Sequence, residues 1–439
     1  MNIRFTLTIF VVFIFLCVGQ AQEMITVEQA VALAIEKNYD IKLSENILSS
    51  VELDNSYAFG AFLPQLNGSA SRVWNTSNQK QLLADNSTRQ QKGLKSNTQA
   101  AAVQLTWTLF DGTKMFATRE RLEELVRQGE INVKGQITNT VAQVITNYFN
   151  IVQQKQQLKA TQEQMSVSEE RVKLAEKKLQ VGTGGKPELL QAKVDLNTQR
   201  TQVLQQEAAI AQLKEQLRGL VGMQLPELYD VSDTIIIDLG LKREDIELNI
   251  ANQNFALLSA KRDIEIARLA LHERKAEQFP TISFNSAYSY NKSTNAVSLN
   301  PGIPLYSQSN GYNYGFSAAI PILGGFNRRR LVQQAKITLS RQQTIYDQQK
   351  YMVDVGVRNA YVNYDNAKQV LLVEEETILL AKENVFIALE GFKRGITTFI
   401  ELRTAQQSLA DAYNRLINAR YLAKVAETEL LRLNGSLLK

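Results

Sequence analysis

The stretch that decides the fold is residues 137–220, which read ITNTVAQVITNYFNIVQQKQQLKATQEQMSVSEERVKLAEKKLQ, then VGTGGKP, then ELLQAKVDLNTQRTQVLQQEAAIAQLKEQLRGL. Apolar residues recur at every seventh position on both sides of the glycine-rich break. The first ladder runs from Ile137 to Leu179, and the second from Leu189 to Leu217. Because residues seven apart stay on one side of a helix, each ladder is a seam that needs a partner helix. The stretch therefore predicts a long helical hairpin.

A second copy of this hairpin lies 213 residues further on, since Val144 corresponds to Val357. Its ladders read Val357, Tyr364, Leu371, Ile378, Val385 and Phe392, then Leu402, Leu409, Leu416, Ala423 and Leu430. The glycine after the long helix keeps the same spacing, so that Gly182 matches Gly395. This shared register predicts a tandem duplication. The predicted repeats are residues 22–225 and 226–439, with hairpins at 113–222 and 325–434.

The N-terminus is typical of a secretory signal at residues 1–21, with Arg4 before an apolar centre and cleavage ahead of Gln22. The apolar run is too short to span a bilayer as a helix. Cys17 is the one cysteine of the chain, and Leu16 occupies the place where a lipidated cysteine needs a small neighbour, so we do not expect lipidation. A mature chain would then contain neither disulfides nor thiolate metal sites.

The charge and the inventory of reactive side chains argue against an enzyme. The net charge is +5 and becomes +4 without Arg4, and it is mixed along helical faces, so nucleic acid is not a predicted partner. His272 is the sole histidine and lies on an amphipathic helix before Pro280. Residues 182–185 lack the preceding strand and the following Gly-Lys-Ser/Thr of a phosphate loop, which favours a helix terminator. No catalytic residue, cofactor or metal is predicted.

The hydrophobic period changes from helical to two after Pro64 and again after Pro280. Four strands are predicted, at about residues 66–76, 99–109, 281–291 and 312–322, with polar loops at 76–97 and 291–311. One face of each strand is apolar and aromatic, and the other is small and polar. This pattern fits strands of a membrane barrel, and a pair of soluble hairpins is the alternative. Aromatic residues near the strand ends and the signal peptide favour the membrane.

Four strands cannot close a barrel, because the smallest membrane barrels need about eight. Several copies must therefore join at their strand edges, and a dimer or a larger ring would satisfy this need. The two long helices have no proline from Thr113 to Gln180 or from Gly325 to Arg394, and at about 1.5 Å per residue each would be about 100 Å long. A compact globule cannot hold such helices, so a rod or tube is expected.

The chain resembles the TolC family of outer-membrane efflux proteins over essentially its whole mature length. The residues that carry the resemblance are Thr26–Ala34 with Asn38, Leu63-Pro64, Leu109–Gly112, and the helix-turn segments Val181–Leu189 and Arg394–Leu402. The resemblance implies a mixed α/β membrane protein whose long helices form a coiled-coil α-barrel in the periplasm. Four strands per chain would contribute to a trimeric, 12-stranded β-barrel in the lipid of the outer membrane.

The implied function is the passive exit duct of a tripartite efflux or type I secretion system. The implied partners are two further copies of the chain, a periplasmic adaptor (membrane fusion protein) and an inner-membrane pump of the RND or ABC type. A barrel-anchored coiled-coil trimer without transport, as a periplasmic spacer or an adhesin, is the alternative. The sequence does not name the cargo.

The helical turns carry the candidate site. Thr398 to Glu401 reads as a capping box, and Glu188 follows Pro187 in a first helical turn, so both acids have a purely structural interpretation. The functional interpretation is that several copies of Glu188 and Glu401 ring a narrow mouth and attract cations.

The family closes its mouth with an arginine and a tyrosine and lines it with two acidic rings. The matching positions here are Thr397, Phe392 and Thr404, which are not the residues of the family's ion-pair lock, and Lys393 adds positive charge nearby. Six residues match the tips that family adaptors contact. They are Val181, Gly182, Thr183, Arg394, Gly395 and Ile396.

Overall fold

The computed structural model describes residues 23–84, 86–232, 234–297 and 304–437. The predicted signal at 1–21, with Cys17, lies outside the described residues. The chain divides into two units. The helical unit contains the chain up to Ile47, Glu130–Ser259 and the segment from Gln348, and the sheet unit contains Leu48–Gly129 and Ala260–Asp347.

The order of elements in the first half of the chain recurs in the second. The first half contains β1 (Glu23–Ile25), α2 (Val27–Lys37), α3 (Tyr39–Ser56), the 3-10 helix η1 (Ala58–Phe62), β2 (Gln65–Leu82), β3 (Thr88–Phe110), α4 (Lys114–Gln180) and α5 (Lys186–Leu220). The second contains β4 (Tyr229–Val231), α6 (Arg243–Gln253), α7 (Phe255–Ala276), β5 (Thr281–Asn295), β6 (Tyr306–Ala319), α8 (Asn327–Lys393) and α9 (Phe399–Asn434). Among the described helices, none combines the length and the apolar character that a membrane crossing requires.

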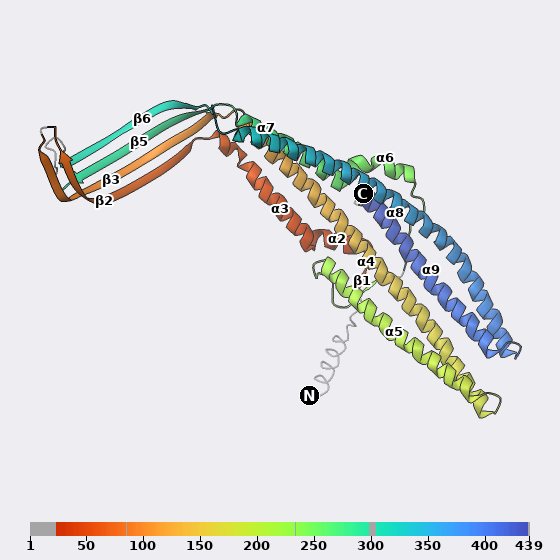
Figure 1. The fold of residues 1–439 in the computed structure, drawn as a ribbon. Helices are drawn as coiled ribbons and strands as arrows, with labels where there is room; N and C mark the ends of the chain where they lie inside the picture. Colours follow the sequence, from red (N-terminus) through yellow and green to blue (C-terminus); the bar gives the residue numbers. More distant parts are fainter. Residues whose placement is uncertain (1–22, 85, 233, 298–303, 438–439) are drawn as a thin grey trace, which may run out of the picture. The chain divides into compact units, whose positions relative to one another are not determined.

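The sheet unit holds an open antiparallel sheet in the order β2-β3-β5-β6 (Figure 1). Residues that pair directly across strands share a face. Val103, Tyr288 and Tyr312 pair in one such row, and Ala102, Ser289 and Gly311 pair in the next. The alternation predicted from the sequence therefore builds one aromatic face and one small, polar face.

The strands run further than the sequence predicts. The predicted loop at 76–97 is too long, because β2 continues to Leu82 and β3 begins at Thr88. In the second pair, β5 continues to Asn295 and β6 begins at Tyr306, so the predicted loop at 291–311 is also too long at both ends. Polar side chains do not prevent pairing, since the backbone ladder satisfies each N–H and C=O group whatever the side chain is. At its other end β6 stops at Ala319, just before Pro321.

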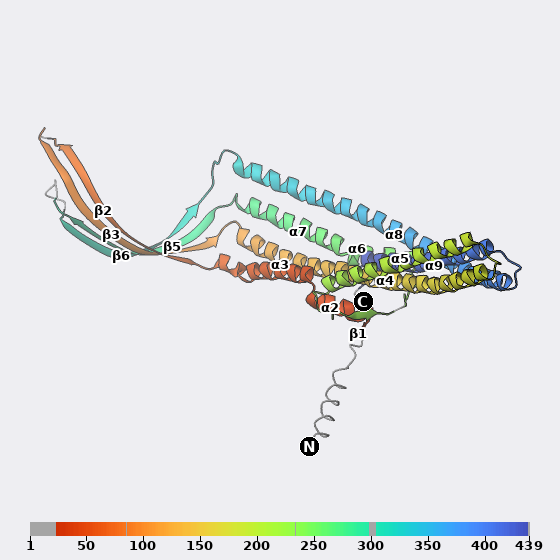
Figure 2. The same ribbon diagram turned by 90° about the horizontal axis from the view of Figure 1, so that it is seen from below.

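In the sheet unit, the parts of α3, α4, α7 and α8 nearest the strands lie side by side in that order (Figure 2). Arg121 of α4 pairs with Glu273 of α7 at 2.8 Å, and Arg262 of α7 pairs with Glu124 of α4 at 3.0 Å. These ion pairs hold α4 and α7 in register next to the sheet.

In the helical unit the apolar ladders meet within each hairpin. Val172 of α4 packs against Ala192 and Leu196 of α5, and Ile378 and Leu371 of α8 pack in one cluster with Leu416 of α9. Within each hairpin, the helix face that carries the apolar residues at seven-residue spacing is therefore buried.

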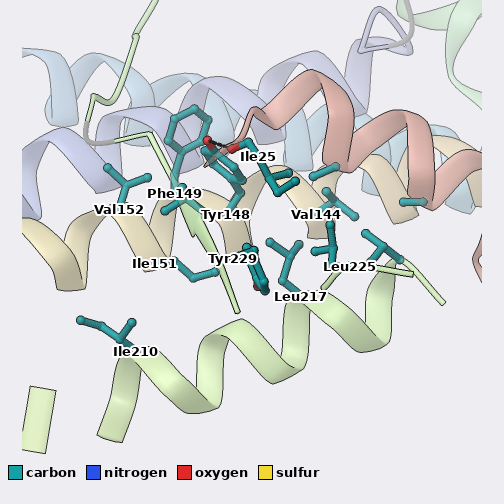
Figure 3. Close-up of a cluster of buried hydrophobic side chains, with 14 of the residues drawn as sticks. Ile25, Val144, Tyr148, Phe149, Ile151, Val152, Ile210, Leu217, Leu225 and Tyr229 are labelled. Carbon is teal, nitrogen blue, oxygen red and sulfur yellow. Dashed lines mark hydrogen bonds between the residues drawn. The ribbon is translucent and has the colours of Figure 1, made fainter. Parts of the chain in front are cut away.

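A separate core forms where β1 and β4 pair in parallel against α4 and α5 (Figure 3). The Tyr148 hydroxyl donates to the carbonyl of Ile25 at 2.8 Å and accepts from the backbone N–H of Ser232 at 3.0 Å. Burial raises the pKa of Tyr148 above its ordinary value. The neutral hydroxyl therefore ties both short strands to α4.

Two equivalent asparagines join the helices of the helical unit end to end. The Asn38 side chain donates to the carbonyl of Leu220 at 2.8 Å and accepts from the N–H of Asp40 at 2.9 Å. Asn254 likewise donates to the carbonyl of Leu433, at 3.0 Å. Because both side chains are buried, each amide satisfies the end of one helix and the start of another.

Candidate functional site at the helical turns

The turn between α4 and α5 depends on two glycines. Gly182 has a φ of +74°, which favours glycine, and its N–H donates to the carbonyl of Leu179 at 3.2 Å. A Cβ on Gly184 would lie 2.8 Å from the Cβ of Lys178. The turn therefore ends α4 within a few residues and reverses the chain into α5, which begins at Lys186.

The turn between α8 and α9 repeats this geometry with different side chains. Gly395 also has a φ of +74°. The Thr397 hydroxyl donates to the carbonyl of Ala388 at 2.9 Å, and a Cβ on Gly391 would lie 2.7 Å from that hydroxyl oxygen. Thr397 thus fastens the turn onto the end of α8, and Gly391 leaves the space for it.

The two predicted acids differ in their contacts. A carboxylate oxygen of Glu401 accepts from the N–H of Thr398 at 2.7 Å, and the Thr398 hydroxyl accepts from the N–H of Glu401 at 3.2 Å. The capping box is therefore present. Glu188 lies in the first turn of α5 behind Gly185, which has no capping side chain, and among the described residues it makes no hydrogen bond or ion pair. Its carboxylate is the freer of the two.

Three further predicted site residues lie at the second turn. Phe392 is half-buried against the α8–α9 seam, and the Lys178 ammonium lies 4.1 Å from its ring centroid. Thr404 is exposed and donates to the carbonyl of Ile400 at 2.9 Å. The side chain of Lys393 lies outside the described residues.

The six residues matched to adaptor contacts lie in the two turns, at one end of the helical unit (Figure 1). Val181 and Ile396 expose 72% and 76% of their surface, which is high for apolar side chains. Arg394 is exposed and has no acidic partner in the described part of the chain. The turns thus present apolar tips and a free cation to any partner.

An ion-pair network that was not predicted from the sequence joins the two hairpins, and we call it the Arg171–Asp195–Arg403 network. Arg171 of α4 donates to Asp195 of α5 at 2.7 Å, and Arg403 of α9 donates to the same carboxylate at 3.0 and 3.1 Å. Arg171 also donates to Gln406 at 3.4 Å and lies over the ring of Phe399. One carboxylate therefore holds cations from both hairpins.

The network is largely removed from water on the α4 side. The side chains of Arg171 and Asp195 are 7% and 16% exposed, whereas that of Arg403 is 49% exposed. Burial lowers the pKa of Arg171 below its ordinary value, and Asp195 opposes that change. Arginine stays protonated at neutral pH, so the site holds two positive charges on one negative charge.

The family model described as outer membrane efflux protein matches residues 32–223 and 249–436, which is most of the chain. This chain belongs to the outer membrane efflux protein family. Curated relatives include the outer membrane protein TolC of Escherichia coli K12, 22% identical over 81% of this chain and 75% of TolC. The cation efflux system protein CusC of Escherichia coli O157:H7 is 23% identical over 92% of this chain and 84% of CusC.

Solved structures of the same fold include the Campylobacter jejuni CmeC outer membrane channel, with a TM-score of 0.79 and 17% identity over 93% of this chain and 85% of that one. A structure of CusC gives a TM-score of 0.77 and 18% identity over 93% and 92% of the two chains. As an outer membrane efflux protein the chain resides in the outer membrane and has a channel role, in a family of channels and not of enzymes. The predicted fold class, with long helices and four membrane strands per chain, is confirmed.

Glu188→Gln is expected to weaken cation selectivity and divalent block about fivefold. Without the ring of negative charges, the binding free energy of a cation in the water-filled mouth becomes less favourable by on the order of 1 kcal/mol. Planar-bilayer recordings in salt gradients measure this. Glu401→Gln should act in the same direction while the amide keeps the capping box.

Glu169→Gln is the matched control for these two variants, because Glu169 lies on α4 outside the turns and pairs with Arg200. If both variants leave the currents unchanged, Glu401 acts only as a helix cap and Glu188 only as a charge in the first turn of α5.

Proposed function

We propose that the chain is the passive exit duct of a tripartite export system, with no catalysis of its own. Three copies would close a 12-stranded barrel and a ring of helices, as the resemblance to the TolC family implies. The observation that supports assembly most directly is the open sheet, whose outer strands β2 and β6 have no strand partner on one side in the described residues. In lipid such edges must pair with another copy.

Apolar ladders on the outside of the helical unit support the same assembly. Leu372, Leu379 and Phe386 are exposed on α8 at seven-residue spacing, next to the ladder that α9 covers. Val167 and Leu174 are exposed on α4 at the same spacing, which continues to the exposed Val181 just after the end of the helix. A neighbouring copy would cover these seams by the same packing that closes each hairpin.

A periplasmic adaptor and an inner-membrane pump of the RND or ABC type are the proposed partners. The adaptor would contact the two helical turns, where Val181 and Ile396 are exposed beside Gly182 and Gly395. The names of the relatives differ in what they say about the cargo. CusC is named as a cation efflux system protein, whereas the name of TolC mentions no cargo. We infer that the pump selects the cargo.

The alternative, a trimeric spacer or adhesin anchored in the membrane, need not conduct ions. The purified assembly inserted in a planar bilayer is expected to give discrete, stable conductance steps. Insertion without conductance, verified by protease protection of the strands, would favour the spacer.

Arg394→Glu is expected to reduce capture of the adaptor by about tenfold, because it reverses the one free cation that the described part of the second turn presents. Pull-down with the adaptor encoded beside this gene measures the effect. Arg200→Glu reverses a charge on α5 away from the turns and is the control. Equal capture by wild type and Arg394→Glu would remove the second turn from the adaptor interface.

A further inference from the structure

The four strands of the sheet unit carry six basic residues and no acidic residue. Five of the six lie in the half of their strand remote from the helices, and Arg72 lies near the middle of β2. The basic residues are Arg72, Lys80, Arg89, Lys92, Lys95 and Lys292. A membrane barrel buries charges on its lipid face at a cost of several kcal/mol, which falls to near zero at the interfaces. Whether a cation contacts lipid or water therefore depends on its depth in the membrane and on the face of the sheet that carries it.

Arg72 and Lys292 lie on the aromatic face. The register pairs Arg72 with Gln99 and Gln99 with Lys292, so the two cations share one row across β2, β3 and β5. The row of Val103 and Tyr288 lies on the same face, four residues closer to the helices. Because an apolar and aromatic face meets lipid and a small, polar face meets water, both cations belong to the lipid-facing side.

Lys292 lies at the outer boundary of the apolar band, and Arg72, two strands away in the same row, lies within about 6 Å of that height at a strand tilt of about 40°. From Ile282 to Lys292 the strand covers about 33 Å at 3.3 Å per residue, which is about 25 Å of height at a tilt of about 40°. An apolar band in such barrels is about 25 Å tall. Since Ile282 lies at the end of β5 nearest α7, Lys292 reaches the level of the headgroups in the outer leaflet.

Both cations are oriented by aromatic neighbours and lack acidic partners among the described residues. The guanidinium of Arg72 lies 4.7 Å from the ring centroid of Trp74, and its Nε donates to Asn97 at 3.2 Å. The ammonium of Lys292 lies 5.5 Å from the ring centroid of Tyr306. Trp74 and Tyr306 belong to the next row outward, which places interfacial aromatics beside the charges.

We propose that Arg72 and Lys292, flanked by Trp74 and Tyr306, bind the phosphorylated headgroup of an outer-leaflet lipid. The two cations stand two strand spacings apart, about 10 Å between backbones, and their long side chains can converge on phosphates of one headgroup. The nitrogens of Arg72 that Asn97 does not engage suit a phosphate oxygen pair. The row is on the face of the sheet, so pairing of β2 or β6 with another copy leaves it uncovered.

The test uses the full assembled protein in nanodiscs of phosphatidylcholine, titrated with bisphosphorylated lipid A and read by native mass spectrometry. Arg72→Gln with Lys292→Gln is expected to weaken binding about 30-fold, since each basic residue near an anionic surface contributes about a factor of five. Lys80→Gln with Lys92→Gln removes the same charge outside the row and should leave binding within twofold. Dephosphorylated lipid A should bind weakly to wild type and to both variants.

Equal lipid A binding by wild type and the Arg72/Lys292 variant would overturn the proposal, as would an equal loss in the control pair. Millimolar inorganic phosphate that displaces the lipid completely would show an anion site without lipid specificity and also overturn it. The conductance of the double variant should match wild type. This separates the lipid site from the channel, because loss of lipid binding with intact conductance leaves the proposed function standing.

Discussion

Asp195→Asn is expected to separate the two hairpins at the level of the Arg171–Asp195–Arg403 network. The amide keeps the shape of the side chain but leaves two arginines without an anion, one of them 7% exposed. Removing one partner of a buried ion pair costs about 3–5 kcal/mol, and we expect the low end because Arg403 is half exposed. A cost of about 3 kcal/mol shifts an equilibrium between joined and separated hairpins about 100-fold.

Spin labels on Thr198→Cys of α5 and Gln407→Cys of α9 measure this separation by double electron–electron resonance. Both positions are exposed, and a chain that begins at Gln22 has no other cysteine. The Asp195→Asn variant should give a longer and broader distance distribution and a higher channel conductance. Arg200→Gln is the matched control, since its pair with Glu169 joins α4 to α5 with both side chains largely exposed. If the distance between the spin labels in Asp195→Asn equals that in wild type, the network does not hold the two hairpins together.

Gly112→Ala is expected to abolish assembly in the outer membrane. Gly112 has a φ of +76° where β3 leads into α4, and a Cβ there would lie 2.3 Å from the carbonyl oxygen of Ala276 and 2.8 Å from the Cβ of Phe279. The left-handed backbone alone costs about 1–2 kcal/mol, and the backbone oxygen cannot rotate away as a flexible side chain would. The yield of folded, heat-modifiable oligomer on gels measures the loss.

The second repeat supplies the control for that variant. Gly325 is the equivalent of Gly112, since both precede the long helices. Its φ is +57°, and a Cβ on Gly325 would meet open space, with no heavy atom of the described residues within 4 Å. Gly325→Ala should therefore lower the free energy of unfolding by about 1–2 kcal/mol, and the variant should still assemble. Equal yields of Gly112→Ala and Gly325→Ala would contradict the steric argument.

The sequence could predict the elements of the fold because each depends on local periodicity. The seven-residue ladder through Val172 predicts the seam of α4, and the alternation around Tyr288 predicts a strand with two unlike faces. The strand ends could not be predicted, because residues such as Gln79 and Gln91 pair in the ladder despite polar side chains.

The candidate site was predicted less completely than the fold. The capping role of Glu401 follows from four consecutive residues, so local sequence was sufficient. The Arg171–Asp195–Arg403 network joins three helices, and which residues face each other depends on how those helices rotate. A comparison of the two repeats could have indicated the network, because its charged residues occur in one copy only. The matching positions in the other copy are the uncharged Asn384, Ser408 and Leu190.

The central claim is that the small, polar face of the sheet lines a conducting pore while the aromatic face meets lipid. Cysteine accessibility in planar bilayers tests it most directly, with Ser289→Cys on the polar face and its neighbour Tyr288→Cys on the aromatic face. A charged, membrane-impermeant thiol reagent is predicted to lower the conductance of Ser289→Cys and to leave that of Tyr288→Cys unchanged. Reduced conductance at Tyr288→Cys with none at Ser289→Cys, or an inserted protein that does not conduct, would contradict the account.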